Sequence, residues 1–516
     1  MLMKYFRIYF LIFCSSLCLS SDLLFAGDIP AKPFDDYNVV LVFIDTLRAD
    51  HLSCYGYFRE TSPNIDKLAE GSFIFKENYS PVSYTLPSFM SIITSLYPVS
   101  HGVWSIRKDK LSGRVKTLAQ ILKIYGYKTA WVGPFNDPQL DPEAGYGRGF
   151  DTFEPGGSNP DSSKTRQTLL DWLDNNNGKK FFLNFHTYKP HAPYFPSPAY
   201  KQRFTEVKNM KGVMTDLQAL DDLCHGSLKE GLRNRELVDG HIGKDIFDQI
   251  TAAGALNGGY DQVVDFFNYI NKPHKLTAYR DYLYWQGIKL EDPEINAYVQ
   301  AVYDAAILEY DKEVLGPVID KLKALDLYDK TIIVICSDHG EEFYEHNDHA
   351  HGRQLYVEST RVPFIIRVPW MKRGKTINDL VQTVDIMPTI LDLLGIPLPA
   401  QTQGKSLVDL MDNKGSGTHN KYAFGKSLAG VNYIRSKEWL LISYDKDSRP
   451  KELYQIASDP KERLNVYSRH KETAFRLGSE LKKWETSLPS YQDEEYSFAP
   501  EIDQTTQERI RKTGYW

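Results

Sequence analysis

The chain has 516 residues, enough to bury a large core in one large domain or in two to four smaller ones. Its composition is ordinary for a globular protein, with 42% hydrophobic and 25% charged residues. A formal net charge of −6 gives no basis for an electrostatic attraction to nucleic acid. We therefore expect a globular protein with no nucleic-acid partner.

The N-terminal segment has the pattern of a secretory signal peptide. Lys4 and Arg7 supply positive charge before a short apolar run at residues 8–19, and a small-residue cleavage site could follow Ala26. The run is shorter than the roughly 20 residues that span a membrane. We expect residues 1–26 to be removed and the protein to be periplasmic or secreted. An uncleaved anchor is the alternative, and only then would the protein contact a membrane.

Short apolar runs alternate with helical patterns along much of the chain. The runs have the length of strands buried on both faces and lie at residues 39–44, 129–132, 181–185, 332–336 and 364–368. The helical patterns lie at residues 63–70, 88–95, 115–125 and 297–324. This alternation predicts an α/β fold with a largely parallel central sheet flanked by helices. In such sheets, ligands collect at the carboxyl ends of the strands.

Three segments divide the chain further. Residues 198–294 are mainly helical in pattern and carry no chemical motif, so we interpret them as an insertion that caps or walls the site. They interrupt a predicted catalytic domain at residues 37–400. Residues 417–490 predict a smaller C-terminal α+β subdomain, and residues 491–516 form a polar tail.

Acidic residues follow two of the predicted strands. Asp45 follows the first run, and Asp338 and His339 follow the run at residues 332–336. An aspartate at the end of a buried strand is costly unless positive charge meets it. Oxygen ligands with one histidine suit Mn²⁺ or Zn²⁺, whereas a purely oxygen site suits Ca²⁺ or Mg²⁺. The pattern therefore predicts a divalent metal site, with a turn or helix-cap aspartate as the alternative for Asp45.

The segment Thr85-Leu86-Pro87-Ser88 has the pattern of a helix start. It places a hydroxyl near the cap position and a proline in the first turn. A helix N-terminus favours a developing alkoxide and an incoming oxyanion. Thr85 is therefore a candidate nucleophile, although a structural N-cap threonine would give the same local pattern.

Residues 83–103 resemble the nucleophile segment of the sulfatase family, within the alkaline phosphatase superfamily. That segment usually reads Cys/Ser-x-Pro-Ser-Arg before a short helix and the ending Pro-x-x-His-Gly-Val. Here the sequence reads Thr85-Leu86-Pro87-Ser88-Phe89 and ends Pro98-Val99-Ser100-His101-Gly102-Val103. Further resemblances in chain order lie at residues 45–50, 126–133, 303–331, 335–341, 361–366 and 439–460. They imply the sulfatase fold over most of the chain.

The resemblance implies that Asp45, Thr85, Asp338 and His339 bind one divalent metal ion. Mn²⁺ or Zn²⁺ is favoured and Ca²⁺ is an alternative, because His339 stands where most sulfatases carry asparagine, as in the phosphonate monoester hydrolase branch. The resemblance also implies catalytic contacts to substrate from His191, the histidine of the Pro-His-x-Pro motif, and from a later histidine, His351. His346, which follows the acidic turn Glu341-Glu342, is a third catalytic candidate.

Thr85 departs from the family in a way that changes the expected chemistry. In sulfatases the matching Cys or Ser is oxidised to formylglycine, and threonine is not a substrate for that oxidation. The hydroxyl itself should therefore attack. A sulfo-threonine cannot expel sulfate by collapsing to an aldehyde, whereas a phospho-threonine can be attacked by water at phosphorus. Pro134 and Asn136 also replace the family's sulfate-binding lysine and histidine.

These features predict a secreted, metal-dependent ester hydrolase that cleaves phosphate or phosphonate esters through Thr85. The alternatives are an ordinary sulfatase, a phosphoryl-group transferase and a non-catalytic binding member of the family. The expected substrate is a small-molecule, glycan or lipid ester.

Overall fold

The computed structural model of the protein describes residues 37–492, apart from 105–108, 134–144, 156–161, 206–231, 371–373, 413–418, 446–448 and several shorter stretches between residues 236 and 287. The expected signal peptide, Pro134, Asn136 and nearly all of the polar tail lie outside the described residues. Among the helices that the structure does describe, none combines the length and the apolar character needed to cross a membrane.

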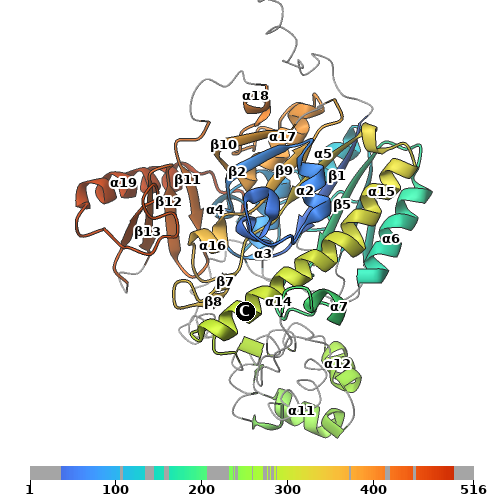
Figure 1. Cartoon of the computed structure of the whole chain (residues 1–516), viewed down its shortest axis with the longest axis horizontal. Helices are drawn as coiled ribbons and strands as arrows, with labels where there is room; N and C mark the ends of the chain where they lie inside the picture. The colour runs from blue at the N-terminus through green and yellow to red at the C-terminus, as the bar shows by residue number, and fades with distance from the viewer. Residues whose placement is uncertain are drawn as a thin grey trace, which may run out of the picture.

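An eight-stranded sheet forms the centre of the molecule, in the order β10-β2-β9-β6-β1-β5-β3-β4 (Figure 1). Strand β9 runs antiparallel to its neighbours β6 and β2, and the other neighbouring pairs in this sheet are parallel. The expected α/β fold with a largely parallel sheet is confirmed. The strands are β1 (Asn38–Ile44), β2 (Phe73–Tyr79), β3 (Lys128–Gly133), β4 (Thr152–Pro155), β5 (Phe181–Thr187), β6 (Thr331–Cys336), β9 (Phe364–Arg367) and β10 (Lys375–Gln382).

Helices cover both faces of this sheet, and β1 shows why. Val39, Leu41 and Phe43 point into one apolar cluster, whereas the alternate residues Val40 and Val42 point into another. The first cluster is shared with α3 (Thr85–Thr94), α5 (Leu118–Ile124) and α17 (Ile386–Leu393). The second is shared with α2 (Pro63–Ala69), α6 (Ser162–Asn175), α14 (Pro293–Tyr310) and α15 (Gly316–Ala324).

The helix predicted at residues 297–324 is interrupted in the structure. A π-helical turn, Asp311–Leu315, separates α14 from α15. The Asp311 carboxylate accepts hydrogen bonds from the backbone N–H groups of Asn64 and Ile65, each at 2.9 Å, and so caps the start of α2. Burial raises the pKa of Asp311 to about 7. The π-helical turn thus connects the long helix to α2. A periodic apolar pattern in the sequence does not reveal such a turn.

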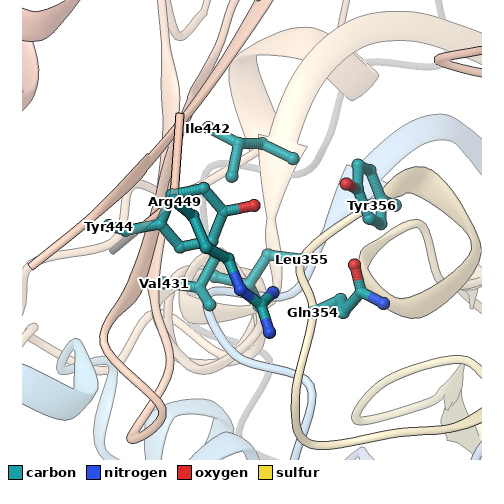
Figure 2. Close-up of a pocket in the computed structure, with 7 residues that line it drawn as sticks. All are labelled: Gln354, Leu355, Tyr356, Val431, Ile442, Tyr444 and Arg449. Carbon is teal, nitrogen blue, oxygen red and sulfur yellow. The ribbon is translucent and has the colours of Figure 1, made fainter. Parts of the chain in front are cut away.

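The C-terminal region contains a second, four-stranded antiparallel sheet. One face packs on α19 (Lys471–Ser487), and the other meets Leu355, Tyr356 and Leu380 of the preceding region (Figure 1). The strands are β11 (Ala423–Lys426), β12 (Val431–Arg435), β13 (Trp439–Tyr444) and β14 (Glu452–Gln455). A shallow depression at this junction (Figure 2) is lined by Gln354, Leu355, Tyr356, Val431, Ile442, Tyr444 and Arg449.

The described part of residues 198–294 has an apolar cluster of its own, built from residues between 232 and 279. It includes α11 (Ile246–Ala252) and α12 (Tyr260–Tyr269), which lie beyond α14 from the central sheet (Figure 1). The short helix α7 (Pro198–Lys201) packs on α14 at the start of this segment. Its role as a cap over the site stays a prediction.

One side chain of α14 holds the turn that follows β1. The Tyr303 hydroxyl donates to the carbonyl oxygen of Thr46 at 2.7 Å and accepts from the backbone N–H of Arg48 at 2.9 Å. Thr46 has a φ of 55°, in the left-handed region that a β-branched residue rarely adopts. The turn next to Asp45 therefore depends on a tertiary hydrogen-bond bridge.

Tyr303→Phe is expected to lower the free energy of unfolding by about 1–3 kcal/mol, because it leaves a buried carbonyl and a buried N–H without their partner. Denaturant titration followed by circular dichroism measures the loss. Tyr310→Phe is the matched control on the same helix, since the Tyr310 hydroxyl has no hydrogen-bond partner among the described residues. An equal loss in both variants would contradict a specific role for the Tyr303 bridge.

Candidate active site

Strands β5, β1 and β6 lie side by side and run parallel, so their carboxyl ends meet at one edge of the sheet. Asp45 directly follows β1, and its N–H donates to the Thr187 carbonyl oxygen at the end of β5 at 3.0 Å. Asp338 lies two residues beyond β6. The topology thus brings together the polar residues that follow separate apolar runs in the sequence.

Asp45, Asp338 and His339 each offer a ligand atom, and these atoms lie within 4.8 Å of one another. All three side chains are fully buried. The Thr85 hydroxyl lies 3.3 Å from Asp45 Oδ2 and 3.3 Å from His339 Nε2. The structure therefore brings together the four residues that the resemblance implies as ligands. Within the described ranges, this is the one group of three or more such side chains with metal-binding geometry.

The orientation of these groups fits a cation. The Nδ1–H of His339 donates to the Gly340 carbonyl oxygen at 2.9 Å, so the Nε2 lone pair faces the carboxylates. Burial lowers the pKa of His339 to about 3, which leaves a neutral imidazole. Asp338 Oδ1 accepts from the backbone N–H of Thr46 and of His339, whereas its buried Oδ2 has no hydrogen-bond partner among the described residues. Two carboxylates, an imidazole and a hydroxyl form a donor set suited to a divalent ion.

Thr85 is the first residue of α3, so the helix begins within the predicted start segment and three residues before the helical pattern at residues 88–95. Tyr84 precedes it in an extended conformation as the N-cap residue. The Ser88 hydroxyl donates to the Asp338 carbonyl oxygen at 2.8 Å and ties the first turn of α3 to the turn after β6. The nucleophile candidate thus lies at a helix N-terminus that is fixed to the metal-ligand turn.

The turn after β6 requires a glycine. Gly340 packs so closely on the backbone of residue 358 that a Cβ atom would lie 1.9 Å from the Glu358 carbonyl oxygen. The Gly340 N–H donates to the Ser359 carbonyl oxygen at 2.9 Å. This contact explains the sequence Asp338-His339-Gly340: the close approach holds both preceding side chains toward the site.

Three histidine rings form a row that leads away from the cluster. His339 lies 4.4 Å from His351, and His351 lies 5.0 Å from His191, measured between ring centroids. The His191 ring is partly exposed, whereas the other two are buried. Burial lowers the pKa of His351 well below its ordinary value, with further lowering from His191 and Arg353. The structure thus places two of the three predicted catalytic histidines beside the metal-ligand candidates.

Glu341 orients His351, and it was not among the site residues predicted from the sequence. The short hairpin of β7 (Glu342–Phe343) and β8 (His349–Ala350) pairs Glu342 with Ala350, which sets Glu341 opposite His351. His351 Nδ1 donates to Glu341 Oε1 at 2.9 Å, so the Nε2 atom is left for the site. The Tyr194 hydroxyl donates to the other carboxylate oxygen of Glu341 at 2.9 Å. The one sequence signal was the position of Glu341 two residues after His339.

The loop that carries His191 is anchored by a buried ion pair. Lys189 Nζ lies 3.1 Å from Glu309 Oε1 on α14 and donates to the Phe195 carbonyl oxygen at 3.1 Å. Glu309 also accepts from the backbone N–H of Ser197 at 2.7 Å. Lys189 stands where the family often has an aspartate, and its ammonium group is held by α14. Lys189 therefore fixes the loop. It supplies no carboxylate that could bind a second metal ion.

His346 lies in a different environment from the histidine row. Its ring stacks on Tyr356 with centroids 3.6 Å apart, and its Nε2 lies 3.3 Å from Glu358 Oε2. These contacts place the ring against α16 (Val357–Thr360) and the residue that precedes it. The structure does not bring His346 into ring contact with the three histidines of the row.

Two further residues near the cluster were not among the predicted site residues. Phe89, at the position of the family's arginine, is fully buried and stacks on Tyr146 with centroids 3.9 Å apart. His186, the next-to-last residue of β5, is fully buried with Nε2 3.5 Å from Asp45 Oδ2. Burial lowers the pKa of His186 well below its ordinary value, so the ring is neutral. The site therefore has an aromatic, uncharged wall beside Asp45.

Comparison with known proteins agrees with this fold. The profile of the Sulfatase family matches residues 37–396. The chain belongs to the sulfatase family. A second sulfatase-derived profile, the N-sulphoglucosamine sulphohydrolase C-terminal region, matches residues 345–487. Sulfatases depend on a divalent metal ion and belong to the alkaline phosphatase superfamily, so this sulfatase-family protein is a hydrolase that acts on sulfuric or phosphoric esters.

Several relatives and solved structures resemble this sulfatase-family chain. The N-acetylglucosamine-6-O-sulfatase of Bacteroides thetaiotaomicron is 24% identical over 471 residues, covering 84% of this chain and 83% of that protein. Human arylsulfatase K is 34% identical over 195 residues, about a third of each chain. A solved structure with the substrate D-glucosamine-2-N,6-O-disulfate has a TM-score of 0.63 at 22% identity, covering 89% of this chain and 100% of that chain.

A phosphonate monoester hydrolase of Agrobacterium radiobacter has a TM-score of 0.61 at 20% identity, covering 87% of this chain and 95% of that chain. The fold is therefore shared with proteins named for sulfate esters and with one named for phosphonate esters. At this level of identity, the likeness shows the fold alone. Whether the substrate is a sulfate or a phosphorus ester must be argued from the residues of the site.

The purified protein is expected to bind about one divalent ion per chain, and Asp338→Asn is expected to weaken binding by more than about tenfold, because changes outside the ligand set alone cost 10–100-fold. Plasma mass spectrometry after dialysis, followed by titration of the stripped protein with Mn²⁺ and Zn²⁺, measures both quantities. Asp320→Asn, on an exposed carboxylate of α15, is the control. Unchanged affinity in Asp338→Asn would show that the cluster does not hold the ion.

Proposed function

We propose that the protein hydrolyses phosphate or phosphonate esters with the unmodified hydroxyl of Thr85 as the nucleophile. The observation that carries this proposal is the position of Thr85 Oγ1, at the start of α3 and 3.3 Å from both Asp45 Oδ2 and His339 Nε2. A hydroxyl becomes a nucleophile near neutral pH when positive charge or a base lies beside it. A divalent ion held by Asp45, Asp338 and His339 would supply that charge and neutralise the bound ester.

The first half-reaction forms a bond between Thr85 Oγ and phosphorus and breaks the bond from phosphorus to the leaving oxygen. The hydroxyl proton leaves along the hydrogen bond to Asp45 Oδ2. The N-terminus of α3 stabilises the negative charge of the bound ester. His191 is the partly exposed ring of the histidine row, and its Nδ1 is engaged by the Ala192 carbonyl oxygen. Protonated His191 therefore presents Nε2–H to the leaving oxygen and supplies its proton.

In the second half-reaction, a water molecule attacks phosphorus, and the bond from Thr85 Oγ to phosphorus breaks. His191 takes a proton from this water, Thr85 regains its hydroxyl proton, and phosphate or phosphonate is released. His351, which donates Nδ1–H to Glu341, keeps an Nε2 lone pair that can accept a hydrogen bond from the attacking water. Each proton taken up in one half-reaction is returned in the other.

The surroundings of Phe89 support an unmodified Thr85. The family pattern places an arginine here, four residues after the residue that is oxidised to formylglycine. In this chain the position holds a fully buried phenylalanine that packs on Phe43 and Tyr146. The replacement removes one cation from the segment and agrees with a nucleophile that is used as a plain hydroxyl.

Hydrolysis of sulfate esters on sugars is the second candidate, and the comparisons favour it. The relative with 84% coverage of this chain is named as a sulfatase of N-acetylglucosamine 6-sulfate, and a similar structure holds a sulfated glucosamine. Under this candidate, the substrate is a sulfated glycan, and Thr85 would still attack at sulfur without formylglycine. A comparison of matched sulfate and phosphorus esters separates the two functions.

Metal-loaded protein is expected to turn over p-nitrophenyl phosphate, phosphodiester or phenylphosphonate esters faster than p-nitrophenyl sulfate. Thr85→Val keeps the shape but removes the hydroxyl, and we expect a loss of about 10³-fold or more, since deleting a nucleophile costs on the order of 10⁴–10⁶-fold in well-studied hydrolases. Thr85→Ser keeps the hydroxyl and should retain most of the rate. Metal titration of each variant serves as the control for an intact site.

A phosphorylated Thr85 peptide, trapped by acid quench and identified by mass spectrometry, would support the proposed intermediate. Turnover of the sulfate ester alone would overturn the phosphorus-ester assignment in favour of the second candidate. Full activity of Thr85→Val on every ester would overturn the nucleophile itself.

We also propose that the protein is periplasmic or secreted, on the basis of the basic and apolar pattern at residues 4–19. N-terminal sequencing of the protein made in its own host is expected to start near residue 27. A mature chain that retains residues 1–26 would favour the anchored alternative.

A further inference from the structure

His186 is a buried imidazole that the proposed reaction leaves without a role. It is the next-to-last residue of β5, and its ring lies edge-on to Phe43 and Tyr188, with centroids 4.5 and 4.8 Å away. Its Nε2 lies 3.5 Å from Asp45 Oδ2, which is within ion-pair distance, and makes no hydrogen bond among the described residues. Its Nδ1 lies 3.1 Å from the Tyr146 hydroxyl. Both ring nitrogens therefore face a specific polar atom in an otherwise apolar setting.

These two contacts favour one tautomer of the neutral ring. With the proton on Nε2, an N–H faces the Asp45 carboxylate, and the Tyr146 hydroxyl donates to the Nδ1 lone pair. With the proton on Nδ1, the Nε2 lone pair would face a carboxylate oxygen at 3.5 Å, which is repulsive in a site with little screening. The Nε2–H tautomer is therefore the one that satisfies both neighbours.

The Tyr146 hydroxyl is held in place by packing against the nucleophile helix. The fully buried Tyr146 ring stacks on Phe89 at an interplanar angle of 14°, and its edge meets Trp131 with centroids 5.8 Å apart. Phe89 lies about one helical turn after Thr85 on α3. A continuous series of contacts thus runs from α3 through Tyr146 and His186 to Asp45.

We propose that His186 is a positioning residue for the metal site, donating its Nε2–H to Asp45 Oδ2 while the Tyr146 hydroxyl fixes its tautomer. The contact restrains the Asp45 carboxylate so that its other oxygen is directed at the cation. Hydrogen-bonded partners of metal ligands commonly account for 10–100-fold in metal affinity. The inference rests on the proposed metal site and is independent of whether the ester contains phosphorus or sulfur.

The test measures the dissociation constants of Mn²⁺ and Zn²⁺ for the stripped full-length protein and its variants, by electron paramagnetic resonance or competition with a chelator. His186→Met removes both nitrogens and is expected to raise the dissociation constant by about 10–100-fold. His186→Gln can place an amide N–H near the position of Nε2 and should recover part of the loss. Tyr146→Phe keeps the stacking on Phe89 but removes the hydroxyl that fixes the His186 tautomer. We therefore expect a smaller rise in the dissociation constant.

The double variant separates positioning from general packing. If Tyr146 acts through His186, Tyr146→Phe should add little to the effect of His186→Met, because the group it orients is gone. Tyr310→Phe, in the apolar cluster on the opposite face of the sheet, controls for the loss of a buried hydroxyl. Thermal unfolding of the metal-free variants reports any loss of folding that is unrelated to the ion.

The outcomes distinguish this inference from the proposed function. Absence of metal binding in the unaltered protein would overturn the proposed site itself. A well-folded His186→Met variant with unchanged affinity would overturn only the positioning role. Additive effects of Tyr146→Phe and His186→Met would show that Tyr146 acts by another route, and would overturn the proposed tautomer control.

Discussion

Two fully buried carboxylates, from Asp45 and Asp338, meet at the carboxyl edge of the central sheet with ligand atoms within 4.8 Å. Their mutual repulsion and their removal from water are costly unless positive charge lies between them. The backbone amides that face Asp338 Oδ1 offset part of this cost, yet burial still raises the pKa of the Asp338 carboxyl. The arrangement is thus suited to a cation, and the neighbouring elements hold these two groups in place.

That constraint reaches far from the sheet edge. The turn after β1 places Thr46 in a left-handed conformation, and the Tyr303 hydroxyl of α14 bridges the backbone on both sides of it. The turn after β6 needs Gly340 because the backbone near Glu358 approaches it closely. The same helix α14 holds the His191 loop through the pair of Glu309 with Lys189. One helix therefore fixes both a metal-ligand turn and the loop that carries a candidate acid.

The parts of the fold that were predicted from the sequence are those whose burial is uniform. Strands β1, β3, β5, β6 and β9 are continuous apolar runs, and each was expected close to its observed bounds. Strand β10 (Lys375–Gln382) forms a sheet edge and mixes polar with apolar residues, β4 is a four-residue edge strand, and β2 ends in the polar residues of Lys76-Glu77-Asn78-Tyr79. Strand β2 has only the three apolar residues Phe73-Ile74-Phe75 before its polar end, and the other two strands have no apolar run of that length, so local pattern did not identify them.

The candidate site divides in a similar way. Asp45, Thr85, Asp338 and His339 lie directly at the ends of predicted elements, where topology alone brings them together. Glu341 and His186 reach their neighbours through strand pairing: hairpin register places Glu341 beside His351, and the pairing of β5 with β1 places His186 beside Asp45. His346 has the right residue type near the right segment, but its ring stacks on Tyr356 instead. Side-chain direction within a loop depends on tertiary packing, which the sequence does not expose.

The two departures of this chain from the sulfatase pattern, at Thr85 and Phe89, lie about one helical turn apart on α3 and have a joint consequence. They lie four residues apart on α3, so they face the same side of one helix. Replacing an arginine with Phe89 substitutes a stack of Phe89 on Tyr146, backed by the neutral His186, for a fixed positive charge. In the proposed reaction, the positive potential at the Thr85 hydroxyl would then come from the ion and from the N-terminus of α3. A nucleophile activated in this way would need no oxidised side chain, and its dependence on the ion would be correspondingly stronger.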